Sequence, residues 1–441
     1  MLMPPDPVAN ESTEEMSEKE ARVLALIEAR LDRLTDLLRT LVRFQTPNPP
    51  GGNEREAQAW IGARLQELEM AVETFDALPG RPNVVGRLHG SGGGRSAMFN
   101  GHIDVAELRT PEAWTRPPYG GVVENGRMYG LGTSDMKSAH AGFLLALIAL
   151  REAACVLAGD VIYESVIGEE RGEPGTRACV ERGITADFAI VGECSKAETV
   201  FVSSVGVVNG RIEIRDPLTQ HLIQRRHMVR APGRLDGANC IDKMATKVIP
   251  ALLELEQRWG DSKSHPLLPS GQALINIFAI DGGGNPFILP DSCRAFVTVV
   301  YLPGEDLGGV KHEVEQQLQA LAAEDGWLAD HPATVEWNPP EFPVQFVPMD
   351  GSPRDPGATL LAKCLAAAGG RPADVGGRDA IMDGGWLHQA GIPTVVFGPG
   401  DKSVIHRPDE YVELEDVLRY AKTIALFLLR WCGAEDLGTR R

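Results

Sequence analysis

Histidine and acidic residues recur in this sequence at positions where strand-like segments end. The first pair, His102 and Asp104, follows the β-type run 96–99 and is separated by one residue. Residues i and i+2 of a strand point to the same side. The Asp104 carboxylate can therefore accept the N–H of one ring nitrogen of His102 and leave the other nitrogen free for a metal ion. A lone His-x-Asp pair is weak evidence, so the downstream residues decide its meaning.

Five further residues of these types follow: Asp135, Glu169, Glu170, Glu193 and His406. Each also has an ordinary explanation, as a helix cap for Asp135 or as an exposed turn or loop residue for the others. Two histidines and three carboxylates together suit a pair of divalent ions that share a bridging carboxylate. One glutamate then remains to act as general base.

The segments that must position these residues alternate between helical and strand patterns. Apolar residues spaced by three to four between 23 and 41 predict a long amphipathic helix, which ends at the Pro- and Gly-rich stretch 46–52. Polar residues follow several of the predicted strands, which indicates an α/β layer fold with its site along one sheet edge. The other predicted helices are 54–69, 139–153, 356–368 and 413–432, and the strands are 72–75, 83–88, 160–166, 188–191 and 393–397.

Residues 205–340 follow a different order. The predicted succession is strand 205–214, helix 238–259, strands 273–280 and 293–301, helix 306–323 and strand 333–337. This βαββαβ order is that of a ferredoxin-like α+β unit. We therefore expect a catalytic domain formed by 17–204 and 341–433 that carries 205–340 as an inserted lid. The polar residues 1–16 are expected to be a disordered tail.

Composition narrows the class of protein. A chain of 441 residues suggests two domains. Its net charge of −18 argues against nucleic acid or an anionic membrane as partner. No apolar run reaches the roughly 18–20 residues that span a bilayer, and the N-terminus lacks the pattern of a signal peptide. Seven cysteines without a CxxC pair are typical of reduced thiols in a cytoplasmic protein.

Four motifs resemble those of the co-catalytic zinc hydrolases, which include acetylornithine deacetylase, succinyl-diaminopimelate desuccinylase, aminoacylase and glutamate carboxypeptidase. The similarity extends from about residue 20 to 432 and includes the lid. The motifs are Gly-His-Ile-Asp-Val at 101–105, Tyr-Gly-Leu-Gly-Thr-Ser-Asp-Met-Lys at 129–137, Glu169-Glu170 with Gly-Thr at 175–176, and Gly-Pro-Gly at 398–400 followed by His406 and Glu410.

The resemblance implies a three-layer α/β catalytic domain that holds two divalent metal ions, zinc first and cobalt or manganese as alternatives. It implies that Asp135 bridges the ions, with His102 and Glu193 on one ion and Glu170 and His406 on the other. Glu169 would take a proton from water and pass it to the leaving amine, and Asp104 would orient His102.

The resemblance also implies a catalytic lid histidine and a homodimer formed through the lid. Two residues fit, His221 and His227, and we favour His221 from its spacing after the first lid strand. His227 lies among arginines that could instead bind a substrate anion. Lid closure is expected to bring His221 to the ions of its own chain or of a partner subunit.

The implied substrate is a small acylated amine. Many members of the resembled family hold a substrate carboxylate with a lid arginine, but Val300 occupies that position here. Arg294 and Arg378 are possible replacements, and Asn276, Arg378 and Gly398 are the predicted substrate contacts. Residues 165–176, 219–221 and 382–386 resemble the formylaminopyrimidine deformylases. An aminopeptidase or dipeptidase, or a catalytically silent binding protein, are the alternatives.

Overall fold

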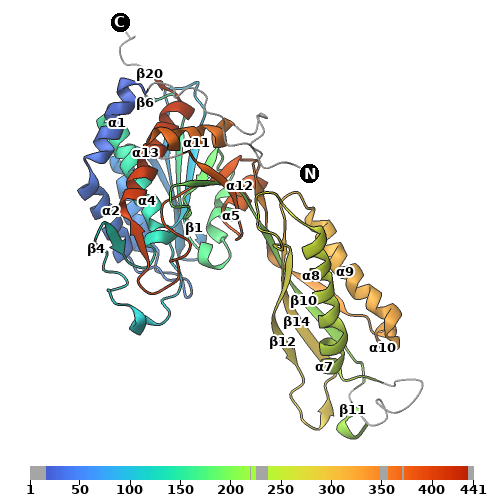
Figure 1. The fold of residues 1–441 in the computed structure, drawn as a ribbon. Helices are drawn as coiled ribbons and strands as arrows, with labels where there is room; N and C mark the ends of the chain where they lie inside the picture. Colours follow the sequence, from blue (N-terminus) through green and yellow to red (C-terminus); the bar gives the residue numbers. More distant parts are fainter. Residues whose placement is uncertain (1–15, 219, 225–236, 348–355, 370–371, 436–441) are drawn as a thin grey trace. The chain divides into compact units, whose positions relative to one another are not determined.

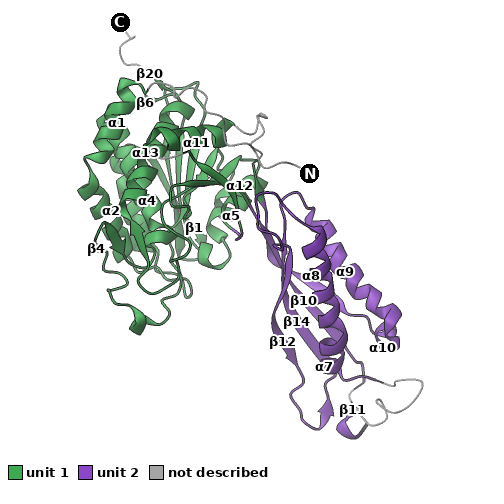
Figure 2. Ribbon diagram, in the orientation of Figure 1, with its two compact units in different colours: residues 1–203, 345–378, 382–441 green, residues 204–344, 379–381 purple. Residues whose placement is uncertain are grey.

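A computed structural model describes residues 16–218, 220–224, 237–347, 356–369 and 372–435. The chain divides into two compact units (Figure 2). The large unit comprises residues 1–203, 345–378 and 382–441, and the inserted unit comprises residues 204–344 and 379–381. The inserted unit covers the range for which the sequence predicts the α+β lid.

A mixed sheet forms the centre of the large unit (Figure 1). Its middle strands β7, β3, β8 and β18 are mutually parallel, whereas β1 pairs antiparallel with β2, β2 with β7, and β9 with β18. The carboxyl ends of the parallel strands therefore meet at one edge. In spatial order the strands are β1 (Ala71–Leu78), β2 (Arg81–Leu88), β7 (Val161–Val166), β3 (Ala97–His102), β8 (Ala189–Val191), β18 (Thr394–Val396), β9 (Thr199–Ser204) and β16 (Gln345–Phe346), with β17 (Asp374–Arg378) paired to β9.

Helices cover both faces of this sheet, which gives three layers. Phe99 of β3 packs against Phe143 of α4 on one face, with ring centroids 4.6 Å apart. Val85, Met98 and Ile162 pack on the other face in the cluster that includes residues of α5 and α12. The first face carries α1 (Glu18–Glu28), α2 (Leu31–Arg43), α3 (Arg55–Glu67), α4 (Ser138–Glu152), α11 (Pro356–Ala367) and α13 (Leu414–Trp431), and the second carries α5 (Pro174–Glu181) and α12 (Gly384–Gln389).

The predicted long N-terminal helix is two helices. The first, α1, begins with a capping box in which Ser17 and Glu20 exchange hydrogen bonds, and it ends at Glu28. The second, α2, begins at Leu31 after Arg30, whose guanidinium pairs with Glu152 of α4 at 2.5 Å. The apolar spacing continues across the break, which is why the sequence pattern did not reveal it.

The inserted unit is a four-stranded antiparallel sheet with two long helices. The spatial order is β12 (Leu274–Gly282), β14 (Ser292–Tyr301), β10 (Gly206–Arg215) and β15 (Thr334–Phe342), so that β12 lies at an edge. Alternate residues of β14 are buried, which produces an apolar face under α8 (Ile249–Ser262) and α9 (Leu307–Glu324). This order of strands and helices is ferredoxin-like, as the sequence predicts.

Shorter elements complete the two units. In the inserted unit they are α7 (Cys240–Lys243), α10 (Gly326–Asp330) and a two-stranded antiparallel sheet of β11 (Gln220–His221) with β13 (Ile288–Leu289). In the large unit they are β4 (Val122–Glu124), β5 (Arg127–Tyr129), β19 (Tyr411–Glu413), β6 (Val156–Leu157) and β20 (Ala434–Glu435). Within the described ranges, no helix is both long and apolar enough to cross a membrane.

Candidate metal centre

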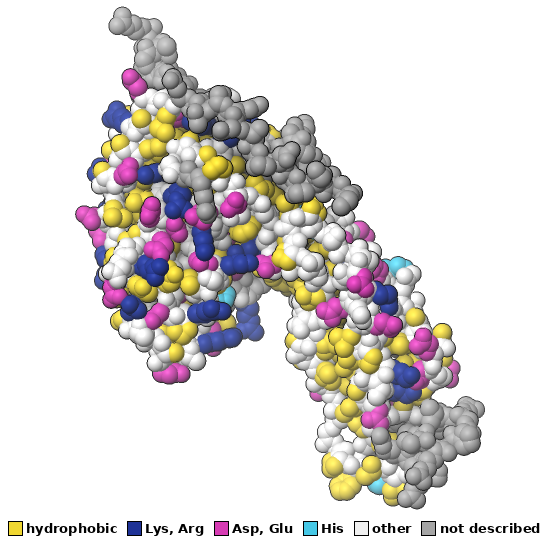
Figure 3. All heavy atoms as spheres, in the orientation of Figure 1, with side chains coloured by type: hydrophobic (Ala, Val, Ile, Leu, Met, Phe, Trp, Pro, Cys, Tyr) yellow, Lys and Arg dark blue, Asp and Glu magenta, His cyan; other side chains and the backbone are white. Residues whose placement is uncertain are grey.

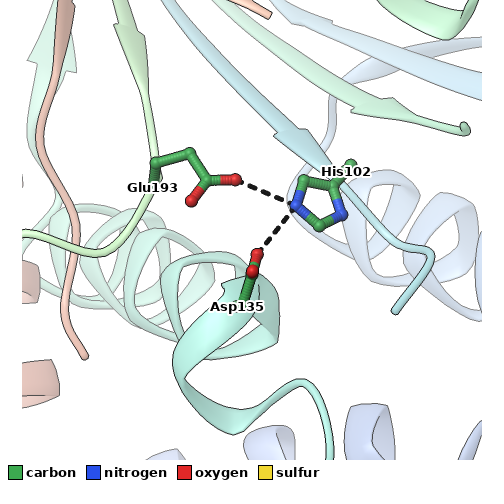
Figure 4. Close-up of side chains that lie close together, drawn as sticks. All are labelled: His102, Asp135 and Glu193. Carbon is green, nitrogen blue, oxygen red and sulfur yellow. Dashed lines mark hydrogen bonds and ion pairs between the residues drawn. The ribbon is translucent and has the colours of Figure 1, made fainter. Parts of the chain in front are cut away.

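His102, the last residue of β3, lies between two carboxylates at the edge of the sheet. Its Nε2 lies 3.0 Å from Oδ1 of Asp135 and 2.9 Å from Oε1 of Glu193 (Figure 4). All three residues are buried. Glu193 follows β8, which is the direct neighbour of β3 in the sheet, so the parallel topology itself brings these two side chains together. The sequence prediction that strand ends converge is confirmed at this edge.

A second group of three residues forms around the other oxygen of Asp135. Nε2 of His406 lies 3.0 Å from Oδ2 of Asp135 and 3.2 Å from Oε2 of Glu170. The His406 side chain is 48% exposed, so this group is open to solvent from one side. Asp135 is common to both groups, and its two carboxylate oxygens point to different histidines.

The donor atoms suit metal ions. Within each group the candidate ligand atoms lie within 4.8 Å of one another. Imidazole nitrogens and carboxylate oxygens are common ligands of zinc and of other first-row divalent ions. The residues present therefore fit two ions that share Asp135, as the sequence predicted for His102, Asp135, Glu170, Glu193 and His406.

The carboxylates of the two groups also favour positive charge at the positions of the histidines. Hydrogen bonds to Asp135 and Glu170 raise the pKa of His406 to about 10. Burial would lower the pKa of His102, but its hydrogen bonds to Asp135 and Glu193 outweigh burial and raise the pKa well above its usual range. Positive charge is thus held on both imidazoles, at the place where cations would balance the same carboxylates.

The backbone of the turn that carries Asp135 is hydrogen-bonded to a buried glutamate, Glu410. Oε1 of Glu410 accepts hydrogen bonds from the backbone N–H groups of Ser134, at 2.8 Å, and Asp135, at 3.2 Å. Burial raises the pKa of the Glu410 carboxyl to about 8. The motif containing His406 and Glu410 therefore contributes two features to the centre. His406 is a candidate ligand, and Glu410 stabilises the backbone that carries Asp135.

Glu169, the predicted base, lies beside the first group without belonging to either. Its Oε2 is 3.8 Å from Nε2 of His102, and its side chain is 16% exposed. Burial raises the pKa of Glu169 well above the usual range; the charge of His102 opposes this effect and the carboxylate of Glu193 adds to it. A carboxylate beside the ligands but outside their sets is in the position that a general base requires.

Asp104 differs from its predicted geometry. Nδ1 of His102 donates to the backbone carbonyl of Asp104 at 2.9 Å, whereas the nearest carboxylate oxygen is 3.8 Å away. The carboxylate instead accepts hydrogen bonds from the backbone of Gly168 and Glu170 and from the side chain of Asn48. The Nδ1 atom of the His102 ring is therefore hydrogen-bonded to the main chain of Asp104, not to its carboxylate.

The predicted substrate contacts occupy different surroundings. A Cβ on Gly398 would lie 2.1 Å from the carbonyl oxygen of Gly192, so this glycine permits the loop after β18 to pack on the backbone before Glu193. Arg378 is buried and donates to the carbonyl of Cys194 at 3.2 Å. Asn276 is exposed on β12 of the inserted unit. Their contacts with substrate stay predictions.

The structure describes one of the two lid histidines, His221. His221 is exposed on β11, which pairs with β13. His227 lies outside the described residues. The preference for His221 as the catalytic lid histidine stays a prediction.

Sequence reasoning missed three supporting residues. Asn48 was interpreted only as part of a helix-ending stretch, but its side chain reaches Asp104. His140, inside α4, donates from Nε2 to the carbonyl of His102 at 3.0 Å, and burial lowers its pKa to about 3. Lys137 is fully buried and donates to the carbonyl of Phe44 at 2.7 Å. A histidine and a lysine inside an otherwise apolar segment, 136–150, were the available signals.

Comparison with known proteins identifies the family. The model of peptidase family M20/M25/M40 matches residues 98–430. The chain belongs to this family. Members of a peptidase family hydrolyse amide bonds, so the protein is an amide hydrolase, as the sequence resemblance implied.

Curated M20-type relatives carry more specific names. The chain is 38% identical over 413 residues to the N-formyl-4-amino-5-aminomethyl-2-methylpyrimidine deformylase of Bacillus subtilis, covering 92% of this chain and 96% of the relative. It is 37% identical to the protein of that name from Halalkalibacterium halodurans, with coverage of 93% and 97%. Identity to succinyl-diaminopimelate desuccinylase 2 of a Ruegeria species is 30%, over 67% of this chain and 72% of that one.

Solved structures share the two-part M20 architecture. Aminopeptidase PepT of Bacillus cereus superposes with a TM-score of 0.69 at 20% identity, covering 90% of this chain and 98% of that chain. A Bacillus subtilis protein described as a dinuclear metal-binding peptidase of family M20 gives a TM-score of 0.65 at 17% identity, with coverage of 92% and 99%. At these identities the likeness establishes the fold.

Proposed function

We propose that this M20 protein is a metal-dependent deacylase that removes a formyl group from a small aminomethylpyrimidine. The observation that carries the proposal is the pair of ligand groups on Asp135, with Glu169 beside them and outside both. The deformylase names of the two relatives at 37–38% identity supply the substrate.

The reaction requires a nucleophile, a base and an acid. Two divalent ions, zinc in the first instance and cobalt or manganese as alternatives, would supply Lewis-acid activation of water and of the acyl carbonyl. Glu169 takes the proton of the attacking water and then delivers it to the amine nitrogen as the C–N bond breaks.

The surroundings of the candidate arginines favour a substrate without a carboxylate. Val300 stands in β14 where the resemblance led us to look for an arginine. Arg294, one possible replacement, already pairs with Glu213 at 3.3 Å and Asp281 at 3.4 Å. Val300 is uncharged and Arg294 is already paired with two carboxylates, so these two described positions favour a neutral formyl group over an anionic succinyl group.

The inserted unit is proposed to act as a lid and to form a homodimer. Its edge strand β12 exposes Phe278 at 58% and Ile280 at 55%, and Phe287 nearby in the chain is 66% exposed. Figure 3 shows hydrophobic side chains gathered on the visible face of this unit. Pairing of such an edge with a second copy would bury these side chains. We further propose that His221 polarises the acyl carbonyl when the lid closes.

The proposed location is the cytoplasm. All seven cysteines are free thiols, and six of them are buried. Free thiols are typical of proteins in a reducing compartment.

A substrate panel tests the proposal. The metal-loaded protein is assayed for amine release from N-formyl-aminomethylpyrimidine, N-succinyl-diaminopimelate, N-acetylornithine and a dipeptide, each with and without chelator. We expect chelator-sensitive release that is fastest from the formylpyrimidine. Faster release from the dipeptide or the succinyl compound would replace the proposed substrate, and silence on all four by a metal-loaded protein would favour a binding function.

A further inference from the structure

The Asp104 carboxylate is one of the most heavily engaged acceptors in the large unit. The residue is fully buried, at 0% exposed. Oδ1 accepts the backbone N–H of Gly168 at 2.7 Å, and Oδ2 accepts the backbone N–H of Glu170 at 3.3 Å and the Nδ2–H of Asn48 at 2.9 Å. Two of the three donors belong to the turn that carries Glu169.

We propose that Asp104 is a positioning residue for the turn Gly168–Glu170 and so fixes the base and the ligand next to it. This differs from the expected orientation of the His102 ring by the carboxylate. The inference rests on the proposed function only where it treats Glu169 as the base.

The ring of His102 does not need the carboxylate. A carbonyl oxygen can only accept, so the Nδ1 proton of His102 is held by the backbone of Asp104. Every amino acid at position 104 carries that carbonyl, and it leaves Nε2 facing Asp135 and Glu193. Loss of the carboxylate therefore leaves the ring with its backbone acceptor.

The turn itself, by contrast, depends on Asp104, although Ile167 just before it is hydrogen-bonded to Asn83 and to the backbone of Gly175. Gly168 has φ +87° and Gly172 has φ +103°, so flexible residues flank the three-residue helical turn Glu169–Arg171. The Gly168 carbonyl accepts from Arg171 and Glu173 within the same segment. Hydrogen bonds to Asp104 are what tie its first N–H groups to the neighbouring strand end.

Asn48, which donates to the same Asp104 oxygen as Glu170, belongs to a third chain segment. Its backbone N–H donates to the carbonyl of Val105 at 2.8 Å, and Thr46 Oγ1 donates to the carbonyl of Ile103 at 2.7 Å. The segment 46–48 is thus fastened alongside 103–105. Three chain segments meet at the Asp104 carboxylate, which explains why a Pro-rich stretch after α2 carries an asparagine in its middle.

The test compares Asp104→Ala and Asp104→Asn with Glu54→Gln. Glu54 is a suitable control because it is also fully buried, and it accepts the Gly52 backbone N–H at 2.8 Å and pairs with Arg81 away from the centre. Hydrogen exchange followed by mass spectrometry reports on the peptide covering 167–172. Cobalt titration, with Glu193→Ala and His406→Ala as references, reports which of the two ions is weakened.

We expect faster exchange in the 167–172 peptide of Asp104→Ala and weakening of the ion that His406→Ala weakens. On the substrate that the wild type turns over, kcat should fall by about 10²-fold, the cost of a displaced catalytic group, with little change in KM. Asp104→Asn keeps one acceptor oxygen and should lie between Asp104→Ala and wild type. Glu54→Gln should leave exchange in this peptide, metal content and kcat unchanged.

Two results would overturn the inference. One is unchanged exchange in the 167–172 peptide of Asp104→Ala. The other is selective loss of the ion that Glu193→Ala weakens, because that ion depends on the His102 ring. A wild type that hydrolyses none of the panel, combined with faster exchange in Asp104→Ala, would support the anchoring of the turn and refute the proposed deacylase function.

Discussion

Among the described residues of this M20 protein, the large unit buries many polar and ionisable side chains, whereas the inserted unit buries few. The large unit buries acids, histidines and a lysine at the carboxyl edge of its sheet, including His102, Asp104 and Lys137. In the described part of the inserted unit, Ser204 and Asp216 are the polar residues that are buried. Burial of ionisable groups is costly unless partners or ions compensate for it.

This difference separates two functions. In the large unit, hydrogen bonds from His102 and His406 to Asp135 compensate for the cost of burying these groups. The fold therefore holds them in place before any ligand binds. In the inserted unit, polar candidates such as His221 and Asn276 are exposed, and so are several large apolar side chains. The large unit thus holds the candidate metal ligands and the proposed base, and we propose that the inserted unit makes contacts with substrate or with another subunit.

The largest effect is expected for Glu169→Gln in the large unit, which removes the proposed base. Turnover should fall by about 10²–10⁴-fold, because the amide cannot take a proton from water. Both metal ions should remain, since Glu169 belongs to neither ligand group. Steady-state kinetics and metal analysis check this result. Glu181→Gln, an exposed glutamate of α5, is the matched control, and turnover of Glu169→Gln close to that of Glu181→Gln would exclude Glu169 as the base.

The corresponding change in the inserted unit is His221→Ala. We expect a fall in kcat of about 10²-fold, the typical cost of losing one donor to a developing oxyanion, with metal content unchanged. Exposed His312 of α9 provides the control variant His312→Ala. Equal kinetics of the two variants would remove His221 from the mechanism and leave the lid with binding functions alone.

The apolar edge of the inserted unit predicts an effect on assembly. Phe278→Asp places a charge on β12 and should weaken the dimer at least about tenfold, because burial of one charge at an apolar contact exceeds 1.4 kcal/mol. Sedimentation at several concentrations measures this effect. Leu253→Asp, which changes an exposed leucine on α8, is the control. A wild type that sediments as a monomer at all concentrations would refute the proposed dimer.

The smallest expected signal is the release of protons when metal ions bind to the centre. His406, with its pKa raised to about 10, is protonated in the metal-free protein at neutral pH, and the raised pKa of His102 has the same sign. Each ion must displace a proton, so metal affinity should rise with pH across the neutral range. Calorimetry at pH 7 in buffers of different ionisation enthalpy should show net proton release, to which the histidines and Glu170, whose pKa burial raises to about 7, contribute. Zero release would mean that the histidines are neutral before metal binds.

Much of the centre could be predicted from sequence because the fold places it at strand ends. The strand β3 ends at His102, and the strands β7, β8 and β18, which are parallel to it, end shortly before Glu169, Glu193 and the loop to His406, respectively. Apolar runs reveal such strands, and polar residues after them are visible in one dimension. The order βαββαβ was sufficient to indicate the ferredoxin-like unit for the same reason.

Other features depend on contacts between distant segments. The carboxylate of Asp104 turns away from His102 toward Gly168, and Asn48 joins it from 56 residues earlier in the chain. The break between α1 and α2 leaves the apolar spacing intact. No local pattern distinguishes a carboxylate that faces its own neighbour from one that faces another strand end, so these arrangements needed the structure.

The most direct test of the account is the metal stoichiometry of wild type and Asp135→Ala, measured by mass spectrometry of the intact protein after equilibration with zinc. We predict two ions per wild-type chain. Asp135 is the residue that both ligand groups share, so its removal should reduce binding at both positions and leave fewer than one ion per chain. One ion per wild-type chain, or two retained by Asp135→Ala, would contradict a centre built on a bridging Asp135.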